Sequence, residues 1–105
     1  MIARIWRGAT RAEDADAYAD YLRRTGVKEY RETPGNEGVF MLRRIVDGRA
    51  EFMMITLWRD LDAVRSFAGD DVATAVFYPR DDDYLIEREL TAEHWEIVDR
   101  SQSSS

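Results

Sequence analysis

Few side chains in this chain of 105 residues are suited to acid–base chemistry. His94 is the only histidine, and imidazole is the side chain whose unperturbed pKa lies near neutrality. Such a group can take the proton of a phenol or an enol, so we predict His94 to be the general base of any catalytic site. The alternative is a surface or ion-paired histidine, because Glu93, Trp95 and Glu96 surround it in the sequence.

Four further side chains are candidates for binding a substrate: Trp6, Arg43, Met54 and Trp58. Indole rings and thioethers line apolar ligand cavities well. Trp58 and Met54 are also ordinary core residues, and Trp58 could serve as a packing anchor whose indole N–H reaches a loop carbonyl. Arg4 and Arg43 lie within predicted strands, where an inward charge needs a counter-ion. That counter-ion could be Glu51, Glu96, a partner subunit or a substrate anion.

Several classes of site are excluded or disfavoured by the residues present. The chain has no cysteine, which excludes disulfides, thiolate catalysis and cysteine-ligated metal sites. The run Asp81-Asp82-Asp83 lacks the alternating ligands and the glycine of a calcium loop, so we interpret it as a solvated charged loop. No phosphate-binding glycine loop, zinc-binding His-Glu-x-x-His or nucleophile elbow occurs. We therefore expect neither a metal nor a cofactor.

Composition and charge indicate one cytoplasmic domain. Hydrophobic residues make up 45% of the chain and charged residues 34%, which suits a single core at this length. No apolar run approaches the roughly 20 residues that span a bilayer, and the N-terminus lacks the apolar segment of a signal peptide. The net charge of −6 disfavours nucleic acid. We predict a domain over residues 1–100 and a disordered serine-rich tail over 101–105.

The stretch from Gly38 to Trp58 predicts a β-hairpin. Asp47-Gly48 is the dipeptide preferred in a two-residue type I′ turn. With that turn at the tip, Val46 lies opposite Arg49, and Arg44 forms a cross-strand pair with Glu51.

Both faces of this hairpin are apolar. One face carries Phe40, Leu42, Met53, Ile55 and Leu57, and the other carries Val39, Met41, Ile45, Phe52, Met54 and Trp58. A monomer with one layer of helices would expose a larger apolar patch than is usual. We therefore expect the chain's helices to cover one face and a second copy to cover the other, in a homodimer.

The remaining elements complete an α+β order. A strand over 2–8 precedes a helix that begins at a capping box from Thr10, continues through Leu22 and stops at Gly26. After the hairpin, Asp60 caps a helix that Gly69 ends, and a short helical piece follows over 70–76. We expect a charged loop over 80–84 and a last strand over 92–98. This order predicts a ferredoxin-like fold: a four-stranded antiparallel sheet with both helices on one face.

The chain resembles the antibiotic biosynthesis monooxygenase superfamily of dimeric α+β barrel proteins. The resemblance rests on Ile2-Ala3-Arg4-Ile5-Trp6-Arg7-Gly8, on Thr56-Leu57-Trp58 at the end of the hairpin, on the helix from Leu61 to Ala68, and on Glu93-His94-Trp95-Glu96-Ile97-Val98. It implies a cavity in each subunit between the sheet and the helices. Some members oxidise phenolic polyketides without metal or flavin, because the substrate anion itself reduces O₂, and others bind and degrade haem.

The resemblance implies a function, although the sequence departs from the family pattern at two positions. Trp58 matches a tryptophan used by cofactor-free members, whereas Met54 stands where an asparagine is sought, and no histidine lies near Phe77, where the haem-degrading branch carries one. We therefore expect a cofactor-independent monooxygenase acting on a small aromatic or polyketide-like substrate. In that hypothesis His94 is the base, and Trp6, Trp58 and Arg43 position the substrate beside Met54. The alternative is a homodimer that binds a small ligand without catalysis or has a structural role.

Overall fold

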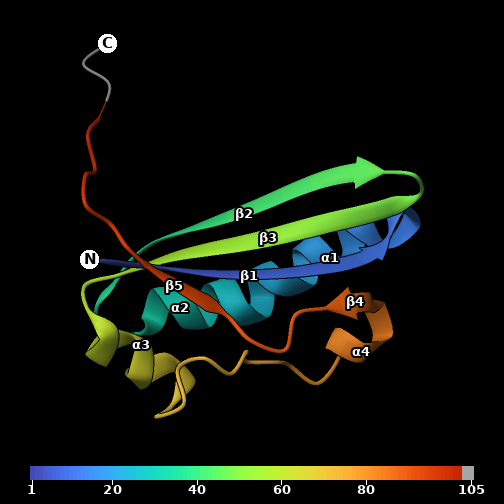
Figure 1. Ribbon diagram of the computed structural model, residues 1–105. Coiled ribbons are helices and arrows are strands. Elements are labelled where there is room, and N and C mark those ends of the chain that lie inside the picture. Colours follow the sequence, from blue (N-terminus) through green and yellow to red (C-terminus); the bar gives the residue numbers. More distant parts are fainter. Residues whose placement is uncertain (103–105) are drawn as a thin grey trace.

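The fold is built on a long hairpin, seen in the computed structural model, which describes residues 1–102. Strands β2 (Asn36–Val46) and β3 (Arg49–Trp58) form it (Figure 1). Asp47 and Gly48 occupy the turn with φ of 51° and 76°, as a type I′ turn requires. The predicted register is confirmed from Val46 opposite Arg49 to Val39 opposite Thr56. Arg44 Nε lies 2.5 Å from a Glu51 carboxylate oxygen.

Strand β1 (Ile2–Arg11) connects the hairpin to the rest of the sheet. It pairs with β3 along one edge, and its other edge is shared by β4 (Leu85–Arg88) and β5 (Glu93–Glu96). The order is β2-β3-β1-β4, with β5 also on β1, and every pairing is antiparallel. The ferredoxin-like α+β fold is therefore confirmed. The predicted last strand over 92–98 is shorter than expected, at Glu93–Glu96. The sheet has five strands where four were predicted, because β4 also pairs with β1 ahead of the break after Arg88.

One helical run and one separate helix pack beneath the sheet (Figure 1). The run comprises the 3₁₀ turn η1 (Ala12–Asp14), α1 (Ala15–Leu22), the π-helical turn η2 (Arg23–Val27) and α2 (Lys28–Glu32). Helix α3 (Leu61–Ala68) follows the hairpin, and the short α4 (Asp81–Tyr84) precedes β4. Asp60 caps α3 by accepting a 2.9 Å hydrogen bond from Ala63 N, and Gly69 ends it at φ 87°, as predicted.

Four local predictions were wrong. Thr10 does not cap a helix, because β1 continues to Arg11 and the Thr10 hydroxyl donates to the Arg11 carbonyl. Gly26 does not end the first helix. It is buried against the Tyr30 ring, so a small residue is needed there for close packing. Residues 70–76 contain no helix, and residues 81–84 form α4 instead of a loop.

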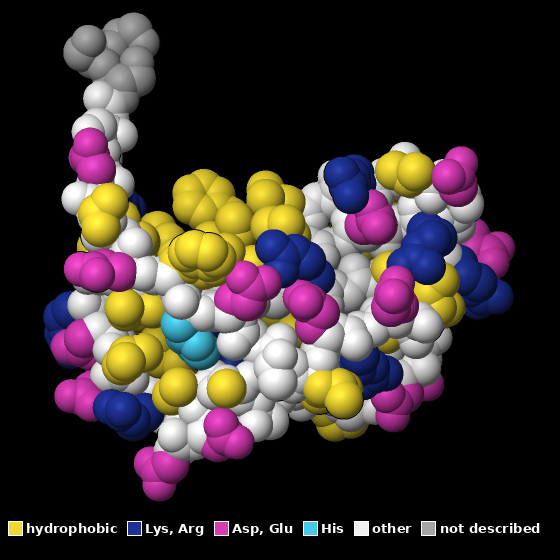
Figure 2. Space-filling view, in the orientation of Figure 1, with side chains coloured by type: hydrophobic (Ala, Val, Ile, Leu, Met, Phe, Trp, Pro, Cys, Tyr) yellow, Lys and Arg dark blue, Asp and Glu magenta, His cyan; other side chains and the backbone are white. Residues whose placement is uncertain are grey.

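The sheet has one covered and one uncovered face. The helix-covered face includes the buried side chains of Phe52, Met54 and Trp58. We define the open face as the opposite side, which carries Ala3, Ile5, Arg7, Phe40, Leu42, Met53, Ile55, Leu57, Glu93 and Trp95. Phe40 is 56% exposed and Trp95 is 58% exposed. Figure 2 shows hydrophobic side chains gathered over the sheet, with charged pairs toward the hairpin tip.

The chain leaves the sheet after β5. Residues 101 and 102 are exposed and belong to no helix or strand, and residues 103–105 of the predicted tail lie outside the described part. Within residues 1–102, no helix combines the length and the apolar character needed to cross a membrane.

Candidate functional site

Two ionisable side chains meet on the helix-covered face, where β1 and β5 run side by side. Arg4 and His94 are direct partners in the antiparallel register, so both side chains project from the same face. Cβ atoms of such partners lie about 5 Å apart. The same row continues through Thr56 of β3 to Val39 of β2. The fold thus places the predicted base beside a guanidinium.

Arg4 is a buried cation without a carboxylate. Its side chain is 4% exposed, and its Nη2 donates to two backbone carbonyl oxygens, at 2.9 Å to Thr74 and 3.3 Å to Val72. Its guanidinium carbon also lies 5.7 Å from the centre of the Phe67 ring, a cation–π distance. Within residues 1–102, no salt bridge reaches Arg4, and its Nε has no hydrogen-bond partner. A buried charge in this state favours an incoming anion.

His94 is held in its neutral form. Its Nε2 is buried and unpaired among the described residues. Burial lowers the pKa of His94 below the usual 6.5, and the neighbouring Arg4 charge lowers it further. A neutral imidazole with an unpaired nitrogen can accept a proton. Figure 2 shows that part of the imidazole reaches the surface, beside hydrophobic side chains.

An irregular strap, residues 69–80, crosses over this pair. Ala75 N donates to the Leu90 carbonyl at 3.0 Å, and Ala92 N donates to the Ala73 carbonyl at 2.8 Å, which ties the strap to the segment before β5. The Tyr78 hydroxyl donates to a Glu29 carboxylate oxygen on α2 at 2.7 Å. The strap therefore joins Arg4, α2 and β5 and limits the access of water to Arg4.

Two of the predicted pocket residues are core residues. Trp58 is fully buried, stacks on Phe67 at 5.8 Å between ring centres, and donates from Nε1 to the Thr56 hydroxyl at 2.8 Å. Met54 is 2% exposed and packs in the cluster around Tyr18 and Phe52. The side chain of Trp58 supports Phe67, and Phe67 in turn faces Arg4.

The other two predicted binding residues occupy different places. Trp6 lies on the helix-covered face two residues after Arg4, donates from Nε1 to the Glu89 carbonyl at 2.7 Å, and meets the Phe77 ring edge-on. Arg43 lies near the hairpin tip, is exposed, and forms a 2.8 Å ion pair with Asp16 of α1. The structure thus brings Trp6 near the Arg4–His94 pair and leaves Arg43 with Asp16, an acid that the sequence did not suggest.

A groove of about 580 Å³ lies where η2 and α2 pass the edge strand β2. We call it the edge groove, and its lining residues are Arg23, Val27, Arg31, Asn36, Glu37, Gly38, Val39 and Met41. Met41 and Asn36 are the cross-strand partners of Met54 and Trp58. The groove therefore lies one strand away from the pocket predicted around Met54 and Trp58. Within residues 1–102 no such pocket forms there, because aromatic side chains pack against both residues.

Arg4 is the functional candidate whose role sequence reasoning missed, since ion pairing was expected there. One signal was available: in the alternating pattern of the first strand, Arg4 shares a face with Ile2 and Trp6, which marks a charge on an otherwise apolar side. Its pairing with His94 depends on the register of β5, which the sequence does not specify.

The three aspartates of the predicted charged loop divide into two roles. Asp81 is buried, accepts hydrogen bonds from the Tyr18 hydroxyl at 3.1 Å and from Tyr78 N at 2.7 Å, and burial raises its pKa. Asp82 pairs with Arg88, and Asp83 pairs with Arg80. In the described part of the chain, no group of three or more acidic or histidine side chains is placed to hold a metal ion.

Comparisons with known proteins agree with this fold. A protein from Bacillus cereus, a candidate antibiotic biosynthesis monooxygenase, superposes with a TM-score of 0.68 at 11% identity, covering 97% of each chain. A candidate of the same kind from Nitrosomonas europaea gives 0.64 at 16% identity, covering 93% of this chain and 99% of its own. The haem degrader MhuD from Mycobacterium tuberculosis, solved with two haems in its active site, gives 0.54 at 18% identity, covering 97% and 100%.

The sequence itself carries a family signature. No curated protein matches the chain as a relative. The profile of the family described as antibiotic biosynthesis monooxygenase matches residues 1–77, which include β1, the helical run, the hairpin and α3. The chain therefore belongs to the antibiotic biosynthesis monooxygenase family.

Proposed function

We propose that this protein is a cofactor-independent monooxygenase that acts on a small aromatic or polyketide-like substrate, with His94 as the base and Arg4 as the group that stabilises the substrate anion. One observation supports this assignment above all. A buried guanidinium without a carboxylate adjoins a neutral imidazole whose Nε2 has no partner in the described residues. A proton acceptor beside a fixed positive charge is the arrangement that ionises a phenol or an enol.

The reaction needs no group beyond the substrate and O₂. His94 Nε2 takes a proton from a phenolic or enolic O–H, and Arg4 stabilises the anion that forms. That electron-rich anion reduces O₂, one oxygen atom ends in a new carbonyl where a ring CH₂ stood, and the other leaves as water with both hydrogens. The balance is R₂CH₂ + O₂ → R₂C=O + H₂O.

The surrounding apolar residues have supporting roles in this proposal. Phe67 covers one side of the Arg4 guanidinium, and Trp58 fixes Phe67 from behind. Trp6 and Met54 extend the apolar surface along the same face. Exclusion of water by these groups strengthens the attraction between Arg4 and an anion. Arg43 would act only on the far end of a long substrate.

Oxygen uptake tests the proposal. Purified protein is mixed with a panel of phenols and anthrone-type compounds, and O₂ consumption and product are followed together. We expect His94→Ala to lower kcat by about 10²- to 10⁴-fold and Arg4→Met by about 10²- to 10³-fold. Arg24→Met is the control, because Arg24 is exposed on the helical run. Equal rates in wild type, His94→Ala and Arg4→Met would refute the assigned roles.

A second candidate function is the binding of a small ligand without turnover. The edge groove favours it, since this groove of about 580 Å³ carries two arginines and an apolar floor, and His94 is not among its lining residues. A ligand held there would be an apolar molecule with an acidic group. Met41→Trp should fill the groove and abolish binding of this ligand. Oxygen uptake should stay unchanged, because His94 does not line the groove.

We also propose that the protein acts in the cytoplasm as a homodimer joined through the open face. Exposed apolar side chains at Phe40, Leu42 and Trp95 support this association. Phe40→Glu should therefore disrupt the dimer. Leu61→Glu is the matched control, because it places the same charge at an exposed apolar position on α3, in the helical layer.

A further inference from the structure

The strap over the Arg4–His94 pair is irregular and is fixed near both of its ends. In Figure 1 it is the yellow-to-orange segment between α3 and α4. It starts at Gly69, whose φ of 87° ends α3, and near its other end Tyr78 N donates to the buried Asp81 carboxylate at 2.7 Å. Between these points most of its side chains are exposed or half-buried. Such a segment can open locally while the rest of the fold persists.

The middle of the strap lies directly on Arg4. The carbonyl oxygens of Val72 and Thr74 accept hydrogen bonds from Arg4 Nη2 at 3.3 Å and 2.9 Å, so they occupy positions that the oxygens of an anion would take. A neutral carbonyl brings no countercharge to the guanidinium, whereas an anion brings a Coulomb attraction that is strong where water is scarce. An anion can therefore displace both carbonyls.

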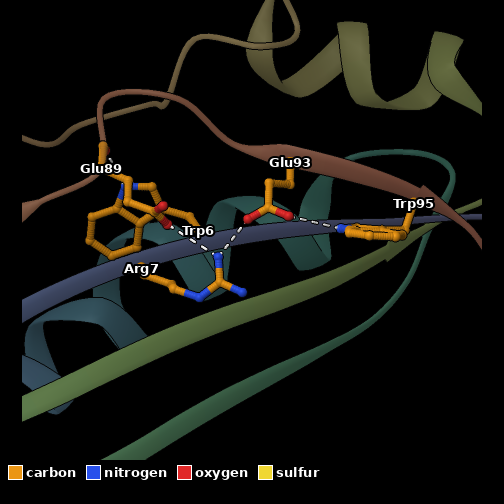
Figure 3. A network of polar contacts seen from close by, with 5 residues as sticks. All are labelled: Trp6, Arg7, Glu89, Glu93 and Trp95. Carbon is orange, nitrogen blue, oxygen red and sulfur yellow. Dashed lines mark hydrogen bonds and ion pairs between the residues drawn. The ribbon is translucent and has the colours of Figure 1, made fainter.

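The strap lies against residues 89–92, which two adjacent residues of β1 hold in place. Arg7 Nη1 lies 3.4 Å from a Glu89 carboxylate oxygen and 2.6 Å from a Glu93 carboxylate oxygen, which ties the two ends of this segment together (Figure 3). Trp6 Nε1 donates to the Glu89 carbonyl at 2.7 Å. Residues 89–92 are therefore the fixed side of the contact, and the strap is the side that can move.

Two contacts outside the Arg4 site keep the strap closed. Thr74 and Thr91 face each other in an isolated antiparallel bridge. The two backbone hydrogen bonds of this bridge run between the flanking residues, at 3.0 Å and 2.8 Å, so the two threonines form a non-hydrogen-bonded pair, with Cα atoms about 4.5 Å apart. On the other side, the Tyr78 hydroxyl donates to a Glu29 carboxylate oxygen at 2.7 Å. This second contact is exposed, so it breaks at little cost.

We propose that the strap is a gate over Arg4, and that the Tyr78–Glu29 hydrogen bond is its latch. In the closed state the two strap carbonyls satisfy Arg4. When the strap moves away about Gly69, a substrate anion takes their place beside His94, and the strap closes again to exclude water. This inference rests on the proposed function for the identity of the anion.

A disulfide across the bridge tests whether the gate must open. The chain has no cysteine, so Thr74→Cys/Thr91→Cys would carry a single pair, at a spacing that suits a disulfide. The probe is 4-nitrophenol, mixed with the protein under nitrogen and followed by its absorbance. We expect the oxidised variant to bind it about tenfold more slowly than the same protein after reduction, which should match wild type. Equal rates before and after reduction would overturn the gate and leave the proposed function standing.

Hydrogen exchange tests the gate without a ligand. We expect the amides of Ala75 and Ala92 to exchange by local opening, faster than those of the central strand β3, and Tyr78→Phe to speed both about fivefold by removing the latch. Tyr84→Phe is the matched control, because its hydroxyl has no hydrogen-bond partner within residues 1–102.

Two outcomes separate the gate from the proposed reaction. Exchange of the strap amides only at the rate of β3, through global unfolding, would refute the gate. Exchange in the expected pattern, in a protein that binds 4-nitrophenol in none of its forms, would support the gate and refute the proposed substrate class.

Discussion

At the scale of single residues, the proposed chemistry depends on a charge and a base that share one side of the sheet. Arg4 keeps its charge in a buried position because two carbonyl oxygens and the face of Phe67 surround it. His94 stays neutral because burial and Arg4 both disfavour its protonated form. In the proposed reaction, this pair accepts one proton and one negative charge from the same substrate.

The first prediction concerns the pH dependence of stability. The folded-state pKa of His94 is lowered, so the unfolded chain binds the proton more readily. This contribution to the free energy of unfolding is complete above the unfolded pKa of 6.5 and is lost as the pH falls through the folded pKa. Urea titrations from about pH 7.5 to about pH 5 should show a smaller decline for His94→Ala than for wild type. Parallel declines would contradict the assigned environment.

The second prediction concerns Asp81. Its removal leaves the Tyr18 hydroxyl and Tyr78 N without their acceptor in a buried site. We expect Asp81→Ala to lower the free energy of unfolding by about 2–4 kcal/mol. Asp82→Ala, which removes an exposed partner of Arg88, should cost less than about 1 kcal/mol. Similar losses for the two variants in chemical denaturation would rule out the buried role of Asp81.

The sequence made His94 a candidate base but did not indicate Arg4 as its neighbour, for a physical reason. Residue type alone identified the only histidine, and alternation placed Arg4 on an apolar face. The contact between them depends on β5 pairing with the N-terminal half of β1, after a break at residues 89–92 that no local pattern announces. The same limit applies to Asp81, which looks like its two exposed neighbours in the sequence.

At the scale of elements, the hairpin was the most predictable part, because turn chemistry fixes its register. Asp47-Gly48 determined every cross-strand partner back to Val39. The helical run was less predictable, since the π-helical turn η2 continues it through Gly26 where a stop was expected. Tertiary packing against Tyr30 outweighs the low helix propensity of glycine there.

Gly35 provides a test at this scale. It adopts φ of +90°, and a Cβ atom there would lie 2.5 Å from Ala63 Cβ at the start of α3. We expect Gly35→Ala to lower the free energy of unfolding by about 2–4 kcal/mol, through backbone strain and overpacking. Gly48→Ala is the matched control, because its φ is also positive, at +76°, but no atom lies within 4 Å; strain alone should cost about 1–2 kcal/mol. Equal losses would show that the contact with α3 is unimportant.

At the scale of the whole molecule, the two faces of the sheet differ in what covers them. The helices cover Phe52, Met54 and Trp58, whereas Phe40, Leu42 and Trp95 stay exposed on the other side. The alternating pattern of the hairpin already predicted two apolar faces. That pattern could not predict the hollow of about 500 Å³ on the open face over Ala9, Leu42 and Met53. The hollow forms because charged side chains from four strands surround these apolar residues.

The most direct test of this account is the mass of the folded chain in solution. Multi-angle light scattering on purified protein, at concentrations down to a few micromolar, should give twice the 12.2 kDa of one chain, and Phe40→Glu should reduce it to a single chain while Leu61→Glu does not. A cooperative, fully folded wild type with the mass of one chain at those concentrations would contradict the claim that the open face needs a second copy.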